Sequence, residues 1–394
     1  MNITVYPGLL SGSVNSIPSK SQAHRLLICA AFAEGPTQIL CPQINRDISA
    51  TANCLKALGA KINHENWGYA VIPIETVPKK AVLNCEESGS TLRFMLPIAG
   101  ALGVDTTFLL TGRLPQRPMS PLWEEMERMG CILTRPTGNT IRCQGKLLPG
   151  DYSIAGNVSS QFITGLMLAL PLVCGLSKLQ VIGTLESKPY VEMTEQALSL
   201  FQVPYSDGTF NGPLPFHSPG ILQVEGDWSN AAFYLAANQL GSRLTVSGLS
   251  ADSRQGDRAC KDLFVRLNDH CQIDCANIPD LVPILSVVAG AHKGACFTNI
   301  RRLRMKESDR VETVVAMLKA LGAYADADEN TLTVYPGRYG KCTVDSAGDH
   351  RIAMAAAIAA TVADGPVTIL DAHCVAKSYP AFWDVFKEMG GKYE

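Results

Sequence analysis

Residues 19–40, near the start of the chain, read SKSQAHRLLICAAFAEGPTQIL. The stretch begins with small polar and charged residues, runs through Ala and Leu, and reaches Gly and Pro before a short segment that ends in Ile and Leu. Five further stretches repeat this order, at residues 88–110, 159–183, 227–248, 279–300 and 348–370. Helices that are apolar on most faces must be buried, so the pattern predicts six buried helices, each followed by a strand.

A second kind of segment alternates with the first. It is amphipathic, with apolar residues at helical spacing, and it usually stops at a glycine. The six copies are residues 51–62, 121–133, 194–205, 261–273, 312–325 and 380–393. Together the two sets predict six units of helix, strand, helix and strand, repeated roughly every 50 to 70 residues.

Six similar units in 394 residues divide most simply into two domains of three, because a chain of this length exceeds one core. We expect an α/β protein with buried helices inside and sheets outside, and one crossover near VEGDWSN at residues 224–230. The alternative is a single parallel sheet, which should show continuous Val and Ile strands followed by Gly-rich phosphate loops. The chain has no convincing example.

Composition restricts the class of function. The formal net charge of −2 gives no overall attraction to nucleic acid or to an anionic membrane. The thirteen cysteines include no Cys-x-x-Cys pair, so we expect reduced thiols and no metal site. The opening residues lack the pattern of a signal peptide, and the longest apolar run contains a proline and is too short to span a bilayer. These features predict a cytoplasmic protein.

The predicted buried helices begin with unusually polar sequence. The residues are Lys20, Ser21 and Arg25; Ser88, Gly89, Ser90 and Arg93; Ser159, Ser160 and Gln161; and Asp349, His350 and Arg351. A helix N-terminus offers unpaired N–H groups and a partial positive charge, and nearby cations add to its attraction for anions. If the helix starts of each domain point the same way, a cleft between the domains would bind polyanions. Ordinary N-caps are the simpler reading of any one segment.

A dense run of charge, RRLRMKESDR, occupies residues 301–310. It would suit a solvated basic face or a nucleic-acid patch. Two acids interrupt the run and no aromatic residue interleaves, which disfavours nucleic acid.

Short strings along the chain resemble one family in their order: SKSQAHR, TGRLPQRPM, SSQF, SKPY, VEGD, MKESDR, GDHRIAM and AKSYP. Together they resemble the 5-enolpyruvylshikimate-3-phosphate synthases, enolpyruvyl transferases of the shikimate pathway, which leads to chorismate and the aromatic amino acids. The resemblance implies two domains of three inverse α/β units each. The C-terminal domain would comprise residues 1–18 and 224–394, the N-terminal domain residues 19–223, and the active site the cleft between them.

The resemblance also implies which residues bind substrate. For shikimate 3-phosphate the matching positions are Lys20, Ser21, Arg25, Ser159, Ser160, Gln161, Ser187, Tyr190, Asp280 and Lys306. For phosphoenolpyruvate they are Lys20, Gly89, Arg117, Gln161, Arg310, Arg351 and Lys377. Planar arginine side chains suit both carboxylate and phosphate oxygens. Because the TGRLPQRP loop is shorter than is usual in the family, either Arg117 or Arg113 would meet the phosphate.

The implied reaction is an addition of the 5-hydroxyl of shikimate 3-phosphate to phosphoenolpyruvate, followed by elimination of phosphate. The resemblance nominates Glu307 as the acid, and Asp280 with Lys20 as the base. No cofactor is expected. The expected partners are the two small-molecule substrates, without nucleic acid or membrane, and the protein is expected to be a monomer.

The chain departs from the family pattern at two further places. Residues 87–90 read ESGS where Asn-Ala-Gly-Thr is frequent, and Arg302 stands where asparagine is common. Two rival functions stay open. A transferase acting on UDP-N-acetylglucosamine would typically carry a cysteine in the Arg-Pro loop, and TGRLPQRP has none. A non-catalytic polyanion-binding module would have no reason to keep acid and base together.

Overall fold

The computed structural model describes all residues from Met1 to Glu394, and the chain divides into two compact units. Unit 1 comprises Met1–Ile17 and Glu225–Glu394, and unit 2 comprises Pro18–Val224. Pro18 and Val224, which were predicted for the C-terminal domain, belong to unit 2. The location of an active site in a cleft between domains stays a prediction.

Three apolar helices form the interior of unit 2: α1 (Lys20–Ala31), α3 (Gly89–Leu102) and α5 (Ser160–Ala169). Each is buried over most of its length, and α3 packs closely on α5. Three amphipathic helices bury one face against them: α2 (Arg46–Ala57), α4 (Leu122–Arg128) and α6 (Lys188–Leu200).

Unit 1 repeats this arrangement. Its buried helices are α7 (Trp228–Gln239), α9 (Val282–Ala291) and α11 (His350–Ala360), and every residue of α11 is buried. Its amphipathic helices are α8 (Cys260–Arg266), α10 (Arg310–Leu321) and α12 (Phe382–Glu388). Five of the six buried helices begin at polar N-caps whose side chains accept a backbone N–H within the first turn: Ser19, Ser88, Ser159, Asp227 and Asp349. The amphipathic helices α2 and α10 begin in the same way, at Asn45 and Asp309.

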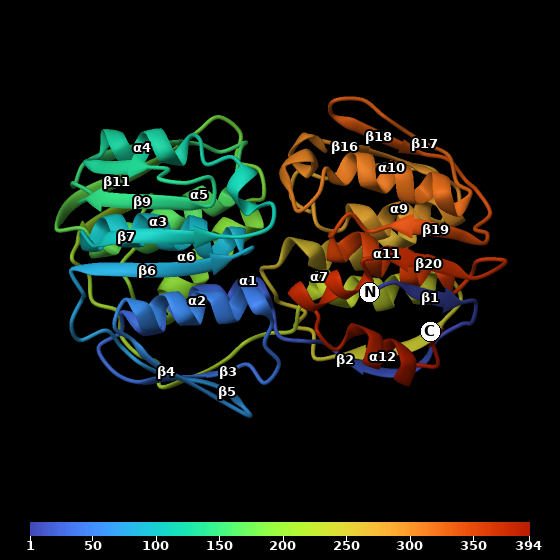
Figure 1. Cartoon of the computed structure of the whole chain (residues 1–394), viewed down its shortest axis with the longest axis horizontal. Coiled ribbons are helices and arrows are strands. Elements are labelled where there is room, and N and C mark those ends of the chain that lie inside the picture. The colour runs from blue at the N-terminus through green and yellow to red at the C-terminus, as the bar shows by residue number, and fades with distance from the viewer. The chain divides into compact units, whose positions relative to one another are not determined.

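Three sheets surround the helices of each unit (Figure 1). In unit 2 they are β13-β3-β5-β4, β6-β7-β9-β8 and β10-β11-β12. Their strands are β3 (Thr37–Leu40), β4 (Lys61–Glu65), β5 (Gly68–Ile72), β6 (Lys80–Glu86), β7 (Asp105–Leu110), β8 (Cys131–Thr134), β9 (Thr140–Gly145), β10 (Asp151–Ala155), β11 (Gly175–Ile182), β12 (Thr209–Gly212) and β13 (Ile221–Gln223).

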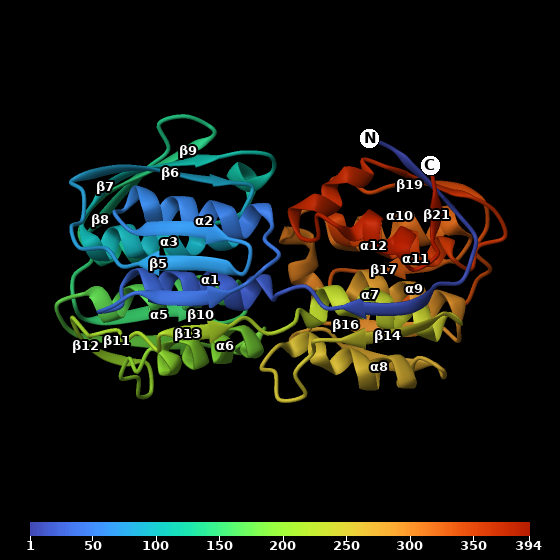
Figure 2. The same ribbon diagram turned by 90° about the horizontal axis from the view of Figure 1, so that it is seen from below.

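In unit 1 the sheets are β14-β2, β15-β16-β18-β17 and β19-β20-β1-β21 (Figure 2). Their strands are β1 (Ile3–Tyr6), β2 (Ser11–Asn15), β14 (Arg243–Ser247), β15 (Cys271–Asp274), β16 (Ala295–Thr298), β17 (Ala325–Ala327), β18 (Thr331–Val334), β19 (Cys342–Asp345), β20 (Val367–Leu370) and β21 (Lys392–Tyr393). The N-terminal strand β1 pairs with β20 and β21, since Ile3 faces Ile369 and Val5 faces Tyr393, whereas β2 pairs with β14.

The prediction of an α/β fold with buried helices inside and sheets outside is confirmed. The third repeat departs most from the pattern. After α6 no strand follows directly, because Gln202 has a positive φ of 53° and Pro204 lacks an N–H, and pairing resumes only at β12. No helix of the structure is both long enough and apolar enough to cross a bilayer.

Candidate active site

A buried arginine organises the predicted site residues of unit 1. Arg310, at the start of α10, is 1% exposed and donates to three carboxylates. Its Nε lies 2.7 Å from Asp349 Oδ2, its Nη1 2.7 Å from Asp280 Oδ1, and its Nη2 2.6 Å from Glu307 Oε2. Charged hydrogen bonds of this length are stronger than neutral ones, so the guanidinium fixes all three acids. The three carboxylates raise the pKa of Arg310 well above its ordinary value, against the effect of burial.

Two further cationic side chains, from two other segments, contact Asp280. Arg351, in the first turn of α11, donates from Nη2 to Asp280 Oδ2 at 3.0 Å, and Lys306 Nζ lies 3.4 Å from Oδ1. Burial alone would raise the pKa of Asp280, but the charges of Arg351, Lys306 and Arg310 hold it well below its ordinary value. Asp280 is therefore ionised at neutral pH and suited to accept hydrogen bonds.

For Lys306, in contrast to Asp280, burial outweighs the nearby opposite charges in its effect on the pKa. Burial lowers its pKa, and the positive charges of Arg310 and Arg302 lower it further, while Asp280 and Glu307 act against this shift. Lys306 follows the short 3-10 helix η4 (Arg301–Met305), which leads into α10. The starts of α9, α10 and α11 thus meet at one cluster of compensated charges.

The predicted residues of unit 2 gather at helix starts as well. Lys20 begins α1, and its Nζ lies 2.9 Å from Oδ2 of Asp47 in the first turn of α2. The hydroxyl of Thr91, in α3, is bonded to Ser88 Oγ at 2.8 Å and lies 3.3 Å from the Asp47 carbonyl. These bonds hold the first turns of α1, α2 and α3 together.

Arg25 joins α1 to α5 and α6 through neutral oxygen atoms only. Its Nε donates to Thr194 Oγ1 at 2.9 Å, and its Nη2 donates to Thr164 Oγ1 at 3.1 Å and to the Tyr190 carbonyl at 2.8 Å. Its Nη1 reaches the Ser21 carbonyl at 2.6 Å. Burial lowers the pKa of Arg25 to about 10, so the guanidinium remains charged at neutral pH.

Gly89, at the start of α3, lies against two arginines. A Cβ built on Gly89 would meet Arg117 Nη1 at 2.6 Å and Arg93 Nη1 at 3.2 Å. Arg93 donates to Gln161 Oε1 at 2.5 Å, and Gln161 Nε2 donates to Ser90 Oγ at 2.9 Å. Arg117 therefore packs beside Gly89, whereas Arg113 is exposed.

The remaining predicted residues lie at or near the ends of helices. Ser159 caps α5 and accepts from Gln161 N, and Ser160 is the first residue of that helix. Ser187 precedes α6 in a left-handed conformation and is 2% exposed. Tyr190 is half-buried in the first turn of α6, and Lys377, at the end of the 3-10 helix η5 (Ala372–Lys377) of unit 1, is also half-buried.

Sequence reasoning missed several residues that the structure places in these clusters. Asp47 pairs with Lys20, Asp349 was noted only as a polar helix start, and Arg93 was not assigned to either substrate. Asp349 also accepts from Ser308 Oγ at 3.1 Å. Asp47 could be recognised in the sequence as an acid in the first turn of a helix. The spacing of residues along the chain does not show that it pairs with Lys20.

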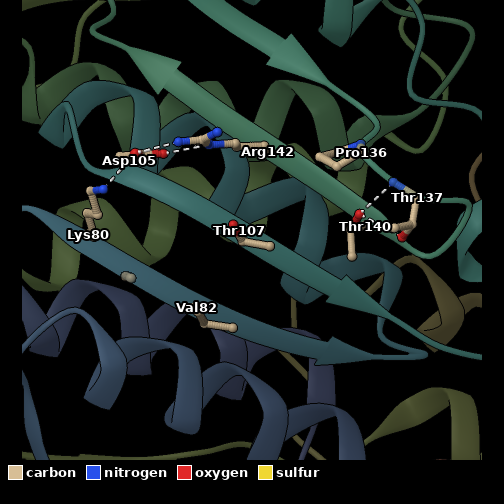
Figure 3. A pocket seen from close by; sticks show the side chains of 9 residues that line it. Lys80, Val82, Asp105, Thr107, Pro136, Thr137, Thr140 and Arg142 are labelled. Carbon is tan, nitrogen blue, oxygen red and sulfur yellow. Dashed lines mark hydrogen bonds and ion pairs between the residues drawn. The ribbon is translucent and has the colours of Figure 1, made fainter.

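A groove of about 520 Å³ lies elsewhere in unit 2, on the outer face of the sheet β6-β7-β9-β8 (Figure 3). Asp105 occupies one side of it, 2.9 Å from Arg142 and 4.0 Å from Lys80. Val82, Thr107 and Thr140 line the rest, on three adjacent strands. None of the predicted site residues lines this groove, and its charges compensate one another.

Known proteins resemble this chain over its whole length. The family described as EPSP synthase (3-phosphoshikimate 1-carboxyvinyltransferase) matches residues 6–386. A 3-phosphoshikimate 1-carboxyvinyltransferase of Clostridium beijerinckii is 36% identical over 428 residues, with 100% of this chain and 98% of the relative covered. The enzyme of the same name from Clostridium kluyveri is 36% identical over 418 residues with the same coverage.

Solved structures share the fold. An EPSP synthase from Acinetobacter baumannii superposes with a TM-score of 0.81 at 20% identity, covering 100% of this chain and 99% of that one. The enolpyruvyl transferase NikO from Streptomyces tendae gives a TM-score of 0.78 at 16% identity, covering 100% and 98%.

Proposed function

The chain belongs to the EPSP synthase family, and from this premise we propose that it transfers the enolpyruvyl group of phosphoenolpyruvate to the 5-hydroxyl of shikimate 3-phosphate. The observation that carries the proposal is the arrangement around Arg310, which holds Asp280 and Glu307 within 2.7 Å of one guanidinium. Lys306, Arg310 and Arg351, which match the family from the sequence, surround the same carboxylates and support this proposal.

In the first proposed step the 5-hydroxyl oxygen bonds to C2 of phosphoenolpyruvate. The hydroxyl proton passes to a base, and C3 gains a proton from an acid, which yields a tetrahedral intermediate. Glu307 is the proposed acid, and ionised Asp280, together with Lys20, serves the hydroxyl. In the second step C3 loses a proton and the C2–phosphate bond breaks, which releases phosphate and leaves an enol ether.

The other proposed residues bind the two anions. Arg25, Ser159, Ser160 and Ser187 would hold the phosphate and hydroxyls of shikimate 3-phosphate, with Tyr190 against the ring. Gly89, Arg117, Gln161, Arg310, Arg351 and Lys377 would hold phosphoenolpyruvate, and Lys20 would contact both substrates. Cations fixed in advance stabilise the charge that develops on the departing phosphate without a cost of reorganisation. In this proposal Arg117, which packs beside Gly89, contacts phosphoenolpyruvate rather than exposed Arg113.

A cytoplasmic location and a monomeric state are part of the proposal. The thirteen cysteines are free, in keeping with a reducing compartment. Analytical ultracentrifugation of the purified chain measures the oligomeric state directly.

Phosphate release from phosphoenolpyruvate tests the function, with shikimate 3-phosphate or UDP-N-acetylglucosamine as acceptor. We expect release with shikimate 3-phosphate alone. Release with the nucleotide sugar alone would overturn the choice of acceptor, and binding without release in either mixture would favour a binding module.

A further inference from the structure

Arg302 is a buried cation that the proposed reaction does not use. It lies in η4, is 8% exposed, and donates from Nη2 to the Ala276 carbonyl at 2.7 Å. Ala276 belongs to the loop that follows β15 and leads to Asp280, whereas η4 follows β16 and leads to Lys306. The bond therefore connects the two loops that leave neighbouring parallel strands.

We infer that Arg302 is a positioning residue that ties the turn carrying Lys306 to the loop carrying Asp280. The contacts that join these loops include the bond from Arg302 and the approach of 3.4 Å between Lys306 Nζ and Asp280 Oδ1. A third bond, from Asn299 Nδ2 to Asp274 Oδ1 at 3.0 Å, is exposed and lies at the ends of the strands. Of the side chains in these three contacts, Arg302 is the least exposed. Its bond to Ala276 therefore fixes the distance between the two loops next to the proposed substrate-binding groups.

The position of Arg302 also has an electrostatic consequence. Lys306 is faced by Asp280 from the loop before α9, by Arg310 from α10, by its neighbour Glu307, and by Arg302 from its own turn. The charge of Arg302 lowers the pKa of Lys306, in the same direction as burial and Arg310. Removal of this charge should raise the pKa of Lys306, and removal of the tether should loosen its contact with Asp280.

The test compares Arg302→Gln with Arg301→Gln. Arg301 lies in the same turn, but its side chain is 74% exposed and pairs with Glu329 on the surface, so it is a matched control for loss of one positive charge. The pKa of Lys306 is measured from the pH dependence of its labelling by an amine-reactive reagent, followed by peptide mass spectrometry. We expect Arg302→Gln to raise this pKa by roughly 0.5 to 1 unit, and Arg301→Gln to leave it within experimental error.

A second variant separates the two roles and guards against a failure to fold. Arg302→Lys keeps a positive charge but loses the planar donor group that reaches Ala276, so the pKa of Lys306 should remain near that of the wild type. Both variants should raise the KM for shikimate 3-phosphate several-fold and change kcat less. An unchanged Lys306 pKa in Arg302→Gln, with only a lower melting temperature, would overturn the inference.

The steady-state part of the test rests on the proposed function, whereas the labelling does not. If the wild type shows no turnover but Arg302→Gln shifts the Lys306 pKa, the proposed function fails and the positioning role stands. If the wild type is active and neither the pKa nor the KM responds to Arg302→Gln, the positioning role alone is wrong.

Discussion

The two clusters use cations in different ways. In unit 1, Arg310 is surrounded by the carboxylates of Asp280, Glu307 and Asp349, which raise its pKa. In unit 2, the hydrogen bonds of Arg25 go to hydroxyl and carbonyl oxygens, and burial lowers its pKa to about 10. Both guanidiniums are buried, but only the first has its charge neutralised by acids.

This difference separates two chemical tasks. Carboxylates that share one site with an arginine and a lysine, and whose pKa values are perturbed, are typical of sites where groups act as acids and bases. A cation held by neutral oxygens keeps its net charge and attracts an anion more strongly. We therefore propose that proton transfer falls mainly to the carboxylates of unit 1, and that the phosphate of shikimate 3-phosphate is held in unit 2.

The largest expected effect comes from Glu307→Gln. The amide keeps the size of the side chain but cannot donate an acidic proton, so kcat should fall roughly 10²- to 10⁴-fold while shikimate 3-phosphate still binds. Phosphate release and calorimetric titration measure the two quantities. Glu312→Gln is the control, because Glu312 is 77% exposed in the first turn of α10. Turnover of Glu307→Gln at the wild-type rate would remove unit 1 from the proton chemistry as assigned.

Asp349→Asn tests whether the acids of unit 1 also stabilise its fold. The side chain is fully buried and accepts from Arg310 and Ser308, so its neutralisation should lower the free energy of unfolding by about 3 kcal/mol. Arg142→Gln in unit 2 breaks a solvent-screened pair with Asp105 and should lower the free energy of unfolding much less. Urea unfolding of both variants gives the comparison, and equal losses would contradict it.

Gly89→Ala tests anion binding in unit 2. The new methyl group would lie 2.6 Å from Arg117 Nη1, and the flexible guanidinium must move away. Loss of one charged hydrogen bond corresponds to about a tenfold rise in the KM for phosphoenolpyruvate, with little change in stability. Gly138→Ala is the control, because nothing lies within 4 Å of its added methyl group. An unchanged KM would place Arg117 outside the binding site.

The smallest expected effects are opposite responses of the two units to pH. In unit 1, burial and then the charge of Asp280 raise the pKa of Asp257 from 3.8 to about 7. Between these values the unfolded chain has lost a proton that the folded chain keeps, so the free energy of unfolding falls as pH rises.

In unit 2, burial lowers the pKa of His24 from 6.5 to about 3. Below pH 6.5 the unfolded chain gains a proton that the folded chain excludes, so stability falls as pH falls.

Hydrogen exchange followed by mass spectrometry reports on each unit separately. In peptides of α7, the free energy of opening should fall by roughly 1 kcal/mol per pH unit between pH 4 and 7, and Asp257→Asn should abolish this dependence. In peptides of α1, His24→Asn should abolish the fall in the free energy of opening below pH 6.5. Identical pH responses in both units of the wild type would contradict these assignments.

The fold could be predicted from the sequence because its helices repeat a strong local pattern. All six apolar stretches became the buried helices α1, α3, α5, α7, α9 and α11. Turn chemistry at single residues limited the prediction, as Gln202 and Pro204 show after α6.

The site was less accessible to sequence reasoning. The family resemblance nominated Asp280, Glu307 and Arg310, but periodicity cannot reveal that segments 30 or 39 residues apart meet at one guanidinium. The contacts of Asp47 with Lys20, and of Arg302 with Ala276, depend on loop paths that no local pattern encodes.

Transfer in heavy water measures the central claim most directly, since the proposed addition delivers a solvent-derived proton to C3 and the elimination removes one. With phosphoenolpyruvate and shikimate 3-phosphate in deuterium oxide, we predict deuterium in the transferred enolpyruvyl group, detected by mass spectrometry, and a severe loss of both transfer and label in Glu307→Gln. A transferred group without deuterium, formed at the normal rate, would contradict the proposed addition and elimination and the role assigned to unit 1.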